Sequence, residues 1–174
     1  MQTTDRSIVL IGFMGTGKSS VGRRLAMRRG WPNLDTDAMI ATSLGMRISE
    51  IFVRLGQERF REEETAVLQR IDVARPAVIV TGGGAILRSQ NRSRLGELGT
   101  VVCLTADLPT LIERLGQRSE RPLLETEDSA ATIESLLRER APLYRETADF
   151  TIETTGLSHD QVAQAIEDSL ANAA

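Results

Sequence analysis

The sequence of 174 residues is poor in several residue types, and each scarcity excludes a class of protein. Its one cysteine cannot form a disulfide within the chain, which excludes a disulfide-stapled domain. Aromatic residues make up 3% of the chain and the formal net charge is −3, which argues against a protein dedicated to nucleic acid. No apolar run is long enough to span a bilayer, and the N-terminus has no apolar signal region, so we expect a cytoplasmic protein without a membrane partner.

The one cysteine and the one histidine are both expected to be structural. Cys103 lies within the apolar run of residues 101–104, where a small buried hydrophobe is a better interpretation than a nucleophile. His159 lies in a polar stretch near the C-terminus, where we expect a surface or helix-start residue rather than a ligand or a base.

Lysine is equally scarce, since Lys18 is the only lysine among 21 lysine and arginine residues. It lies in residues 12–19 (GFMGTGKS), which match G-x-x-x-x-G-K-[ST], the phosphate-binding P-loop. An apolar strand-like run at 7–11 precedes the loop and a helical pattern at 20–27 follows it, the order that this motif requires. We therefore expect backbone N–H groups to cradle phosphates, Lys18 to reach the β- and γ-phosphates, and Ser19 to ligate Mg²⁺.

Strand-like apolar runs alternate with longer helical patterns along the whole chain. The predicted strands are residues 7–11, 33–35, 77–80, 100–104 and 150–152. Helical patterns are predicted from about residue 38, from about 48, and over 57–73, 92–98, 107 onward, 130–145 and 158 onward. This alternation predicts an α/β fold, with a parallel sheet covered on both faces and ligands bound beyond the carboxyl ends of its strands.

Two carboxylates follow the second predicted strand. If Asp35 and Asp37 end that strand, residues i and i+2 share a face and both can point into one crevice; alternatively, Asp37 caps the next helix. Phosphoryl transfer needs one carboxylate near Mg²⁺ and another for the acceptor hydroxyl. Because the third strand ends without an aspartate, Asp35 is the natural replacement for the usual Walker-B carboxylate.

Three further segments favour a binding site without defining it. The triple glycine 82–84 after the third strand suggests backbone pressed against a ligand. Arg61 either pairs with Glu58 and Glu64 on a solvated helix face, or faces inward, is held by Glu64 and grips an anion. The basic loop at 118–124 is either a solvated connection or a lid that brings arginine to the transferring phosphate.

Taken together, these motifs resemble those of the shikimate kinase family over nearly the whole chain. In chain order, the resemblance rests on residues 12–19, 35–37, Phe60-Arg61 with Glu64, 82–84, 121–124 (RPLL) and 140–144 (RAPLY). It implies a nucleoside-monophosphate-kinase-like fold: a three-layer α/β/α sandwich with a five-stranded parallel sheet, in one P-loop kinase domain over residues 1–174. Within that domain it implies a substrate-binding region at about 36–64 and a lid at about 115–128.

The resemblance also implies an activity and a set of site residues. The implied reaction transfers the γ-phosphate of ATP, with Mg²⁺, to the 3-hydroxyl of shikimate, on the way to the aromatic amino acids. The residues implied to act in catalysis are Lys18, Asp37 and Arg121. Those implied to bind the nucleotide are Gly15, Thr16, Gly17, Lys18, Ser19, Ser20, Arg114 (against the adenine) and Arg121. Those implied to bind shikimate are Asp37, Arg61, Gly83 and Arg140, and those implied to serve the metal are Ser19 and Asp35.

Other functions stay open at this point. A gluconate kinase or another small-metabolite kinase of the same fold is the main alternative. A GTP-dependent switch protein would need an asparagine-lysine-x-aspartate motif, for which the chain has no second lysine. An inactive scaffold is disfavoured because every proposed catalytic residue is present. We expect a monomer whose partner is the small-molecule substrate, with no nucleic-acid or membrane partner.

Overall fold

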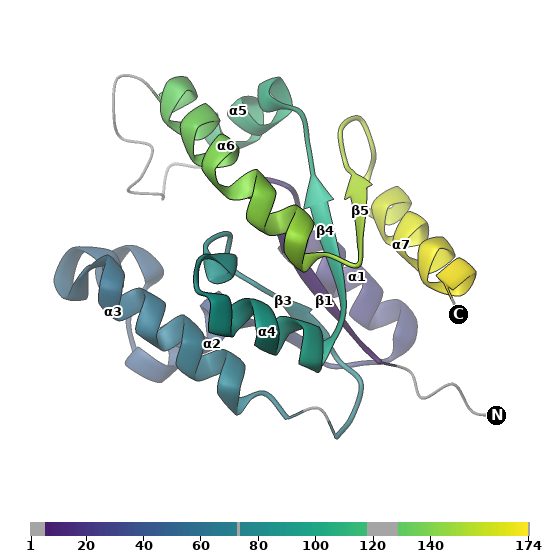
Figure 1. The fold of residues 1–174 in the computed structure, drawn as a ribbon, viewed down its shortest axis with the longest axis horizontal. Coiled ribbons are helices and arrows are strands. Elements are labelled where there is room, and N and C mark those ends of the chain that lie inside the picture. Colours follow the sequence, from purple (N-terminus) through teal and green to yellow (C-terminus); the bar gives the residue numbers. More distant parts are fainter. Residues whose placement is uncertain (1–5, 73, 118–128, 174) are drawn as a thin grey trace.

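The structure is a computed structural model, and it describes residues 6–72, 74–117 and 129–173 (Figure 1). Its centre is one sheet of five parallel strands in the order β2-β3-β1-β4-β5. The strands are β1 (Ser7–Gly12), β2 (Asn33–Asp35), β3 (Val78–Val80), β4 (Gly99–Thr105) and β5 (Phe150–Glu153). The five-stranded parallel sheet is therefore confirmed, and each strand begins within a residue of its predicted position.

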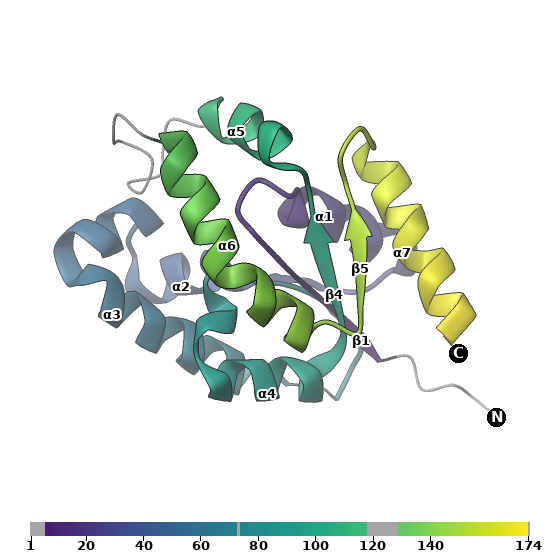
Figure 2. The ribbon, with the colours of Figure 1, turned by 45° about the horizontal axis from the view of Figure 1, so that its top comes forward.

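Helices cover both faces of this sheet, as the alternating pattern predicts. Ile8 and Leu10 of β1 pack with α1 (Lys18–Arg29) and α7 (His159–Ala173), whereas Val9 and Ile11 pack on the opposite face. That opposite face is covered by α4 (Ser89–Leu98), α5 (Leu108–Gly116) and α6 (Ser129–Thr147). Figure 1 shows α4 and α6 in front of the sheet with the fainter α1 behind it, and Figure 2 gives the same arrangement from a second direction.

A smaller apolar cluster joins α2 (Thr36–Leu44) to α3 (Ile48–Arg70) beside the sheet. The two helical segments predicted from about 48 and over 57–73 are consecutive, and they meet at Gly56, whose φ of 84° and ψ of 168° break the helix. That conformation is essentially restricted to glycine. The segment after the break carries the buried side chains Phe60, Arg61 and Glu64.

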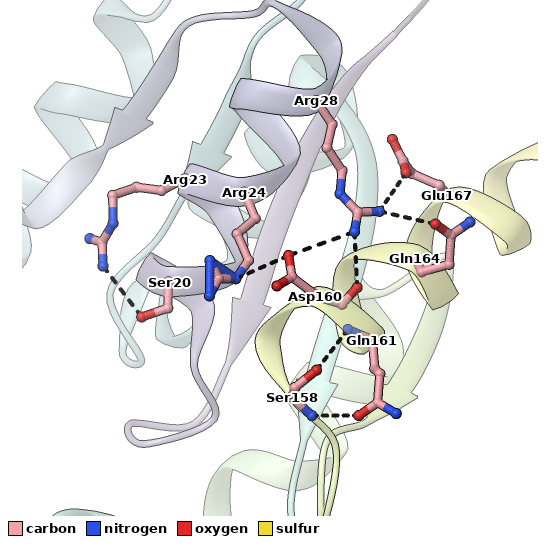
Figure 3. A network of polar contacts seen from close by, with 9 residues as sticks. All are labelled: Ser20, Arg23, Arg24, Arg28, Ser158, Asp160, Gln161, Gln164 and Glu167. Carbon is pink, nitrogen blue, oxygen red and sulfur yellow. Dashed lines mark hydrogen bonds and ion pairs between the residues drawn. The ribbon is translucent and has the colours of Figure 1, made fainter.

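The first and the last helix of the chain, α1 and α7, pack against each other (Figure 3). The capping box predicted at the start of α7 is present: Gln161 N donates to Ser158 Oγ at 3.2 Å, and Ser158 N donates to Gln161 Oε1 at 2.8 Å. Ion pairs then link the two helices, Arg24 to Asp160 at 3.4 Å and Arg28 to Glu167 at 3.0 Å. In the described ranges, no helix has the length and apolar character needed to cross a membrane.

Candidate active site

The P-loop connects β1 to α1, and its backbone turns through three glycines with positive φ: Gly12, Gly15 and Gly17. Lys18, the first residue of α1, is buried and folds back over the loop. Its Nζ donates to the carbonyl oxygens of Gly12 at 2.7 Å and Phe13 at 2.9 Å. The loop therefore holds its single ammonium over the backbone that the motif uses for phosphates.

A polar cleft opens where β1, β2 and β3 end, at the carboxyl edge of the sheet. The residues that line it are Gly15, Gly17, Lys18, Ser19, Ser20, Asp35, Asp37, Thr81, Gly82 and Gly83. These residues come from three separate segments of the chain, and the structure brings them together. Thr16, which the resemblance also assigns to the nucleotide, is buried instead and donates its hydroxyl to Phe13 O at 2.9 Å.

Asp35 joins the P-loop to the start of α2 through its two carboxylate oxygens. Its Oδ2 accepts from the Ser19 hydroxyl at 3.1 Å, while its Oδ1 accepts from the backbone N–H groups of Asp37 and Ala38. Because Asp35 is the cap, α2 begins at Thr36 rather than at about 38, and the alternative in which Asp37 caps the helix is wrong. A serine hydroxyl beside a carboxylate is a donor set that suits Mg²⁺.

Asp37 reaches the cleft from the first turn of α2 and not from an extended strand. The argument from residues i and i+2 of a strand was therefore wrong, although both carboxylates line the same cleft. A Cβ added to Gly82 would lie 2.7 Å from Asp37 Oδ1 and 3.0 Å from Glu64 Oε1. Glycine at this position therefore leaves room for two carboxylates side by side.

Arg61 faces inward, which decides between its two interpretations. The residue is 8% exposed, and its Nη1 pairs with Glu64 Oε2 at 2.5 Å, whereas Glu58 pairs with Arg88. The guanidinium lies flat against Gly84, where a Cβ would overlap it. Burial raises the pKa of Glu64 above its ordinary value of 4.5, and the charge and hydrogen bond of Arg61 oppose that rise.

Arg140 approaches the same glycines from α6. It is 4% exposed, its Cζ lies 5.9 Å from the centre of the Phe13 ring, and its Nη1 lies 3.7 Å from where a Cβ of Gly83 would be. Within the described ranges Arg140 takes part in no ion pair, and its Nε has no hydrogen-bond partner. A buried guanidinium without a counter-ion is costly, so this arrangement favours an anionic ligand.

Arg114 contacts the P-loop from α5. Its Nη1 donates to Gly15 O and to Thr154 Oγ1, both at 3.1 Å, so it ties α5 to the loop and to the end of β5. Its proposed packing against adenine stays a prediction. Arg121, and most of the segment predicted as a lid, lie outside the described residues.

Several site residues were missed at the level of the sequence. Thr81 and Gly82 line the cleft, and their place at the end of β3, next to Gly83, was the available signal. His159 does begin α7, as expected, but its ring also lies beside the P-loop, because a Cβ added to Gly17 would be 3.4 Å from His159 Cδ2. Cys103 is buried, and burial raises the pKa of its thiol to about 11, so its structural role is supported.

This combination of fold and site defines a class. The sheet has five parallel strands, a P-loop follows its first strand, and two carboxylates lie where β2 meets α2. These are the features of a P-loop kinase with the nucleoside-monophosphate-kinase-like fold. Enzymes of this class transfer a phosphate from ATP to a hydroxyl or phosphate acceptor.

Comparison with known proteins identifies the family within that class. The shikimate kinase family model matches residues 14–171. A shikimate kinase of Thermodesulfovibrio yellowstonii is 46% identical over 161 residues, covering 92% of each chain. Another, of Neisseria gonorrhoeae, is 42% identical and covers 88% of this chain and 91% of its own. The chain belongs to the shikimate kinase family.

Solved structures agree with this assignment. A shikimate kinase from Acinetobacter baumannii, in complex with shikimate, superposes with a TM-score of 0.92 at 39% identity, covering 97% of this chain and 94% of its own. A gluconokinase from Sinorhizobium meliloti reaches a TM-score of 0.59 at 21% identity, covering 98% of this chain and 94% of its own. The second likeness shows the shared fold alone.

Proposed function

We propose that this chain transfers the γ-phosphate of ATP to the 3-hydroxyl of shikimate, giving shikimate 3-phosphate and ADP. One observation beyond family membership supports the acceptor. Two buried guanidiniums, Arg61 and Arg140, flank consecutive glycines beside the phosphate loop, and Arg140 forms no ion pair of its own among the described residues. A small acceptor that carries a carboxylate supplies a counter-ion.

The carboxylate grip follows from the chemistry of arginine. A guanidinium presents parallel N–H donors that match a carboxylate in a bidentate way, which an ammonium does not. Arg61 is held in place by Glu64, and Arg140 by its packing beside Phe13 and Gly83. In the proposed complex, the two side chains bind the shikimate carboxylate and the backbone at Gly83 approaches the ring.

The nucleotide is proposed to bind along the P-loop. Gly15, Gly17 and Ser20 line the cleft at the N-terminal end of α1, and a helix N-terminus favours negative charge. Lys18 stabilises the negative charge of the β- and γ-phosphates after leaving its carbonyl partners. Arg114 is proposed to pack against the adenine, and Arg121 to reach the phosphates.

Ser19 and Asp35 are the residues proposed to hold Mg²⁺. Their contact at 3.1 Å provides a hydroxyl and a carboxylate in one place, and phosphate oxygens and waters complete the preferred coordination of this ion. Bound there, Mg²⁺ would neutralise charge on the transferring phosphate. Asp35 is also the α2 cap, so its orientation is fixed before any ligand binds.

Asp37 is the proposed base. It lines the cleft together with the P-loop, and a Cβ added to Gly82 would lie 2.7 Å from its Oδ1. In this position its carboxylate accepts the proton of the reacting hydroxyl and orients that oxygen toward the phosphate. The nearby carboxylate of Glu64 pairs with Arg61 and is 1% exposed, whereas Asp37 lines the cleft and is the acidic group that we assign to the hydroxyl.

We also propose that the enzyme acts as a monomer in the cytoplasm. This proposal is supported by the way the described groups with proposed roles gather in one cleft of a single chain. Light scattering coupled to size-exclusion chromatography tests the first point, and fractionation of cells tests the second.

An assay with a panel of acceptors tests the proposed function. ADP release should be measured with purified protein, ATP, Mg²⁺ and, in parallel, shikimate, gluconate or nucleoside monophosphates. We expect turnover with shikimate alone. Faster turnover with gluconate would replace this proposal by the main alternative of the same fold, because gluconate also carries a carboxylate.

A further inference from the structure

Tyr144, the only tyrosine of the chain, connects α6 to the glycine run of the cleft. It is 4% exposed and follows Arg140 by one helical turn, so both side chains lie on the same face of α6. The Tyr144 hydroxyl donates to the carbonyl oxygen of Gly83 at 2.5 Å. The proposed function gives this residue no task.

The three glycine carbonyls are held in different ways. Gly82 O accepts from Ala85 N and Gly84 O accepts from Leu87 N, each at 3.1 Å, so the following turn of the chain holds both of them. The middle carbonyl, that of Gly83, accepts from the Tyr144 side chain. A run of glycines has few constraints of its own, so a hydrogen bond from another element matters more here than at an ordinary residue.

This hydrogen bond fixes more than one atom. The peptide that joins Gly83 to Gly84 is planar and trans, so a held carbonyl also sets the direction of the Gly84 N–H on the opposite side. Gly83 is packed between the P-loop and α6: a Cβ there would lie 3.3 Å from Met14 N and 3.7 Å from Arg140 Nη1. The bond therefore also sets the position of Arg140 relative to the glycine backbone.

The hydroxyl is a permanent donor. Burial raises the pKa of Tyr144 far above its ordinary value, and the neighbouring charge and hydrogen bond of Arg140 oppose that rise only in part. The proton therefore stays on the oxygen at every pH at which a kinase of this kind operates.

We propose that Tyr144 is a positioning residue for the acceptor: its hydroxyl holds the Gly83–Gly84 peptide and Arg140 in the arrangement that binds shikimate. This inference rests on the proposed function, because it concerns the acceptor half of the same site. It assigns no contact between Tyr144 and either substrate. The bond acts on the acceptor side of the cleft, whereas Lys18 and Ser19 are held by their own contacts with Gly12, Phe13 and Asp35.

Tyr144→Phe tests the proposal, because it removes the hydroxyl and keeps the ring. We expect the KM for shikimate to rise about three- to tenfold, the usual effect of one lost neutral hydrogen bond, and the KM for ATP to stay within about twofold. Hydrogen exchange in the substrate-free protein should become faster over residues 82–87. Thr147→Val is the matched control, since it removes a half-buried hydroxyl of the same helix, and the partner of that hydroxyl, Leu143 O, lies within α6.

The possible outcomes separate the role from simple destabilisation. Equal rises of both KM values, or an unchanged KM for shikimate in a folded Tyr144→Phe protein, would overturn the positioning role. An effect of the same size in Thr147→Val would do so as well. Wild-type protein that does not turn over shikimate overturns the proposed function itself, and this result is read before any variant is made.

Discussion

The arginines of the α1–α7 interface and the arginines of the cleft meet similar partners in different surroundings. At the interface, the Arg28 side chain is 31% exposed and pairs with Glu167 and Asp160, in a network open to solvent (Figure 3). In the cleft, Arg61 and Arg140 are 8% and 4% exposed. Solvent screens the first group, so its ion pairs contribute little, whereas the second group acts in a medium of low polarity.

The difference shows how one residue type can serve two purposes. Each interface arginine has its carboxylate partners within the chain, so its charge is balanced without a ligand. In the cleft, Arg61 pairs with Glu64, whereas Arg140 forms no ion pair within the described residues and interacts with the charge of Glu64 only at longer range. A balanced and exposed arginine is structural, whereas a buried and unbalanced one is suited to an anion from outside the chain.

The largest effect is expected at the carboxylate that shares the cleft with these arginines. Asp37→Asn should fold normally and still bind both substrates, but its kcat should fall by about a hundred- to ten-thousandfold, the usual contribution of a positioned base. Stopped-time ADP assays and shikimate binding by calorimetry measure the two properties. Asp168→Asn, at an exposed carboxylate on α7, is the control. Near-normal turnover in Asp37→Asn would remove this residue from catalysis.

The arginine comparison itself is tested by Arg61→Ala. Loss of a charged hydrogen-bonding grip should raise the KM for shikimate about ten- to a hundredfold, with a much smaller effect on the KM for ATP. Arg28→Ala, at the α1–α7 interface, should leave both KM values unchanged. Equal effects of Arg61→Ala on the two substrates would defeat the proposed grip on the shikimate carboxylate.

The buried partner of Arg61 should give stability an unusual pH dependence. Because the pKa of Glu64 is raised in the folded protein, the unfolded chain releases this proton first as the pH rises through 4.5. The stability that Glu64 contributes therefore falls from that pH upward, until the folded group has also ionised. The Glu64→Gln variant lacks this titrating carboxyl group, so it serves as the reference for the pH dependence.

Chemical denaturation at a series of pH values measures this effect. The difference in unfolding free energy, wild type minus Glu64→Gln, should be constant below about pH 4.5 and decline above it. Glu62→Gln, at an exposed position of the same helix, should give no such slope. A difference that grows with pH would mean that Arg61 outweighs burial and lowers the pKa.

The smallest effect is expected for the exposed network. Arg28→Ala should lower the free energy of unfolding by about 1 kcal/mol or less, because solvent and salt screen its ion pairs. The loss should shrink further when denaturation is repeated at high salt. A fall of several kcal/mol in the free energy of unfolding would contradict the distinction between the exposed arginines and the buried ones.

The sheet and the P-loop could be predicted because their signals are local. A strand buried on both faces appears as a short apolar run, and the phosphate loop has fixed spacing between its glycines and Lys18. Nothing local indicated that Asp35 rather than Asp37 caps α2, because either aspartate is a good cap. The break at Gly56, in contrast, falls between the two helical patterns predicted from about 48 and over 57–73.

The orientation of the site side chains could be predicted only in part. A glutamate three residues after Arg61 is compatible with a solvated pair or a buried one, and tertiary packing decided for the buried pair. The triple glycine was expected to press against a ligand. That contact stays a prediction, and the structure adds a relation between segments distant in sequence: Gly82 and Gly84 make room for the protein's own Asp37 and Arg61.

A crystal structure with shikimate and a non-hydrolysable ATP analogue tests the central claim most directly, namely that two anionic substrates meet in this one cleft. The account predicts the triphosphate along the P-loop at Lys18, the shikimate carboxylate between Arg61 and Arg140, and the reacting hydroxyl at Asp37. A shikimate molecule bound elsewhere, or with its carboxylate turned away from both arginines, would contradict it.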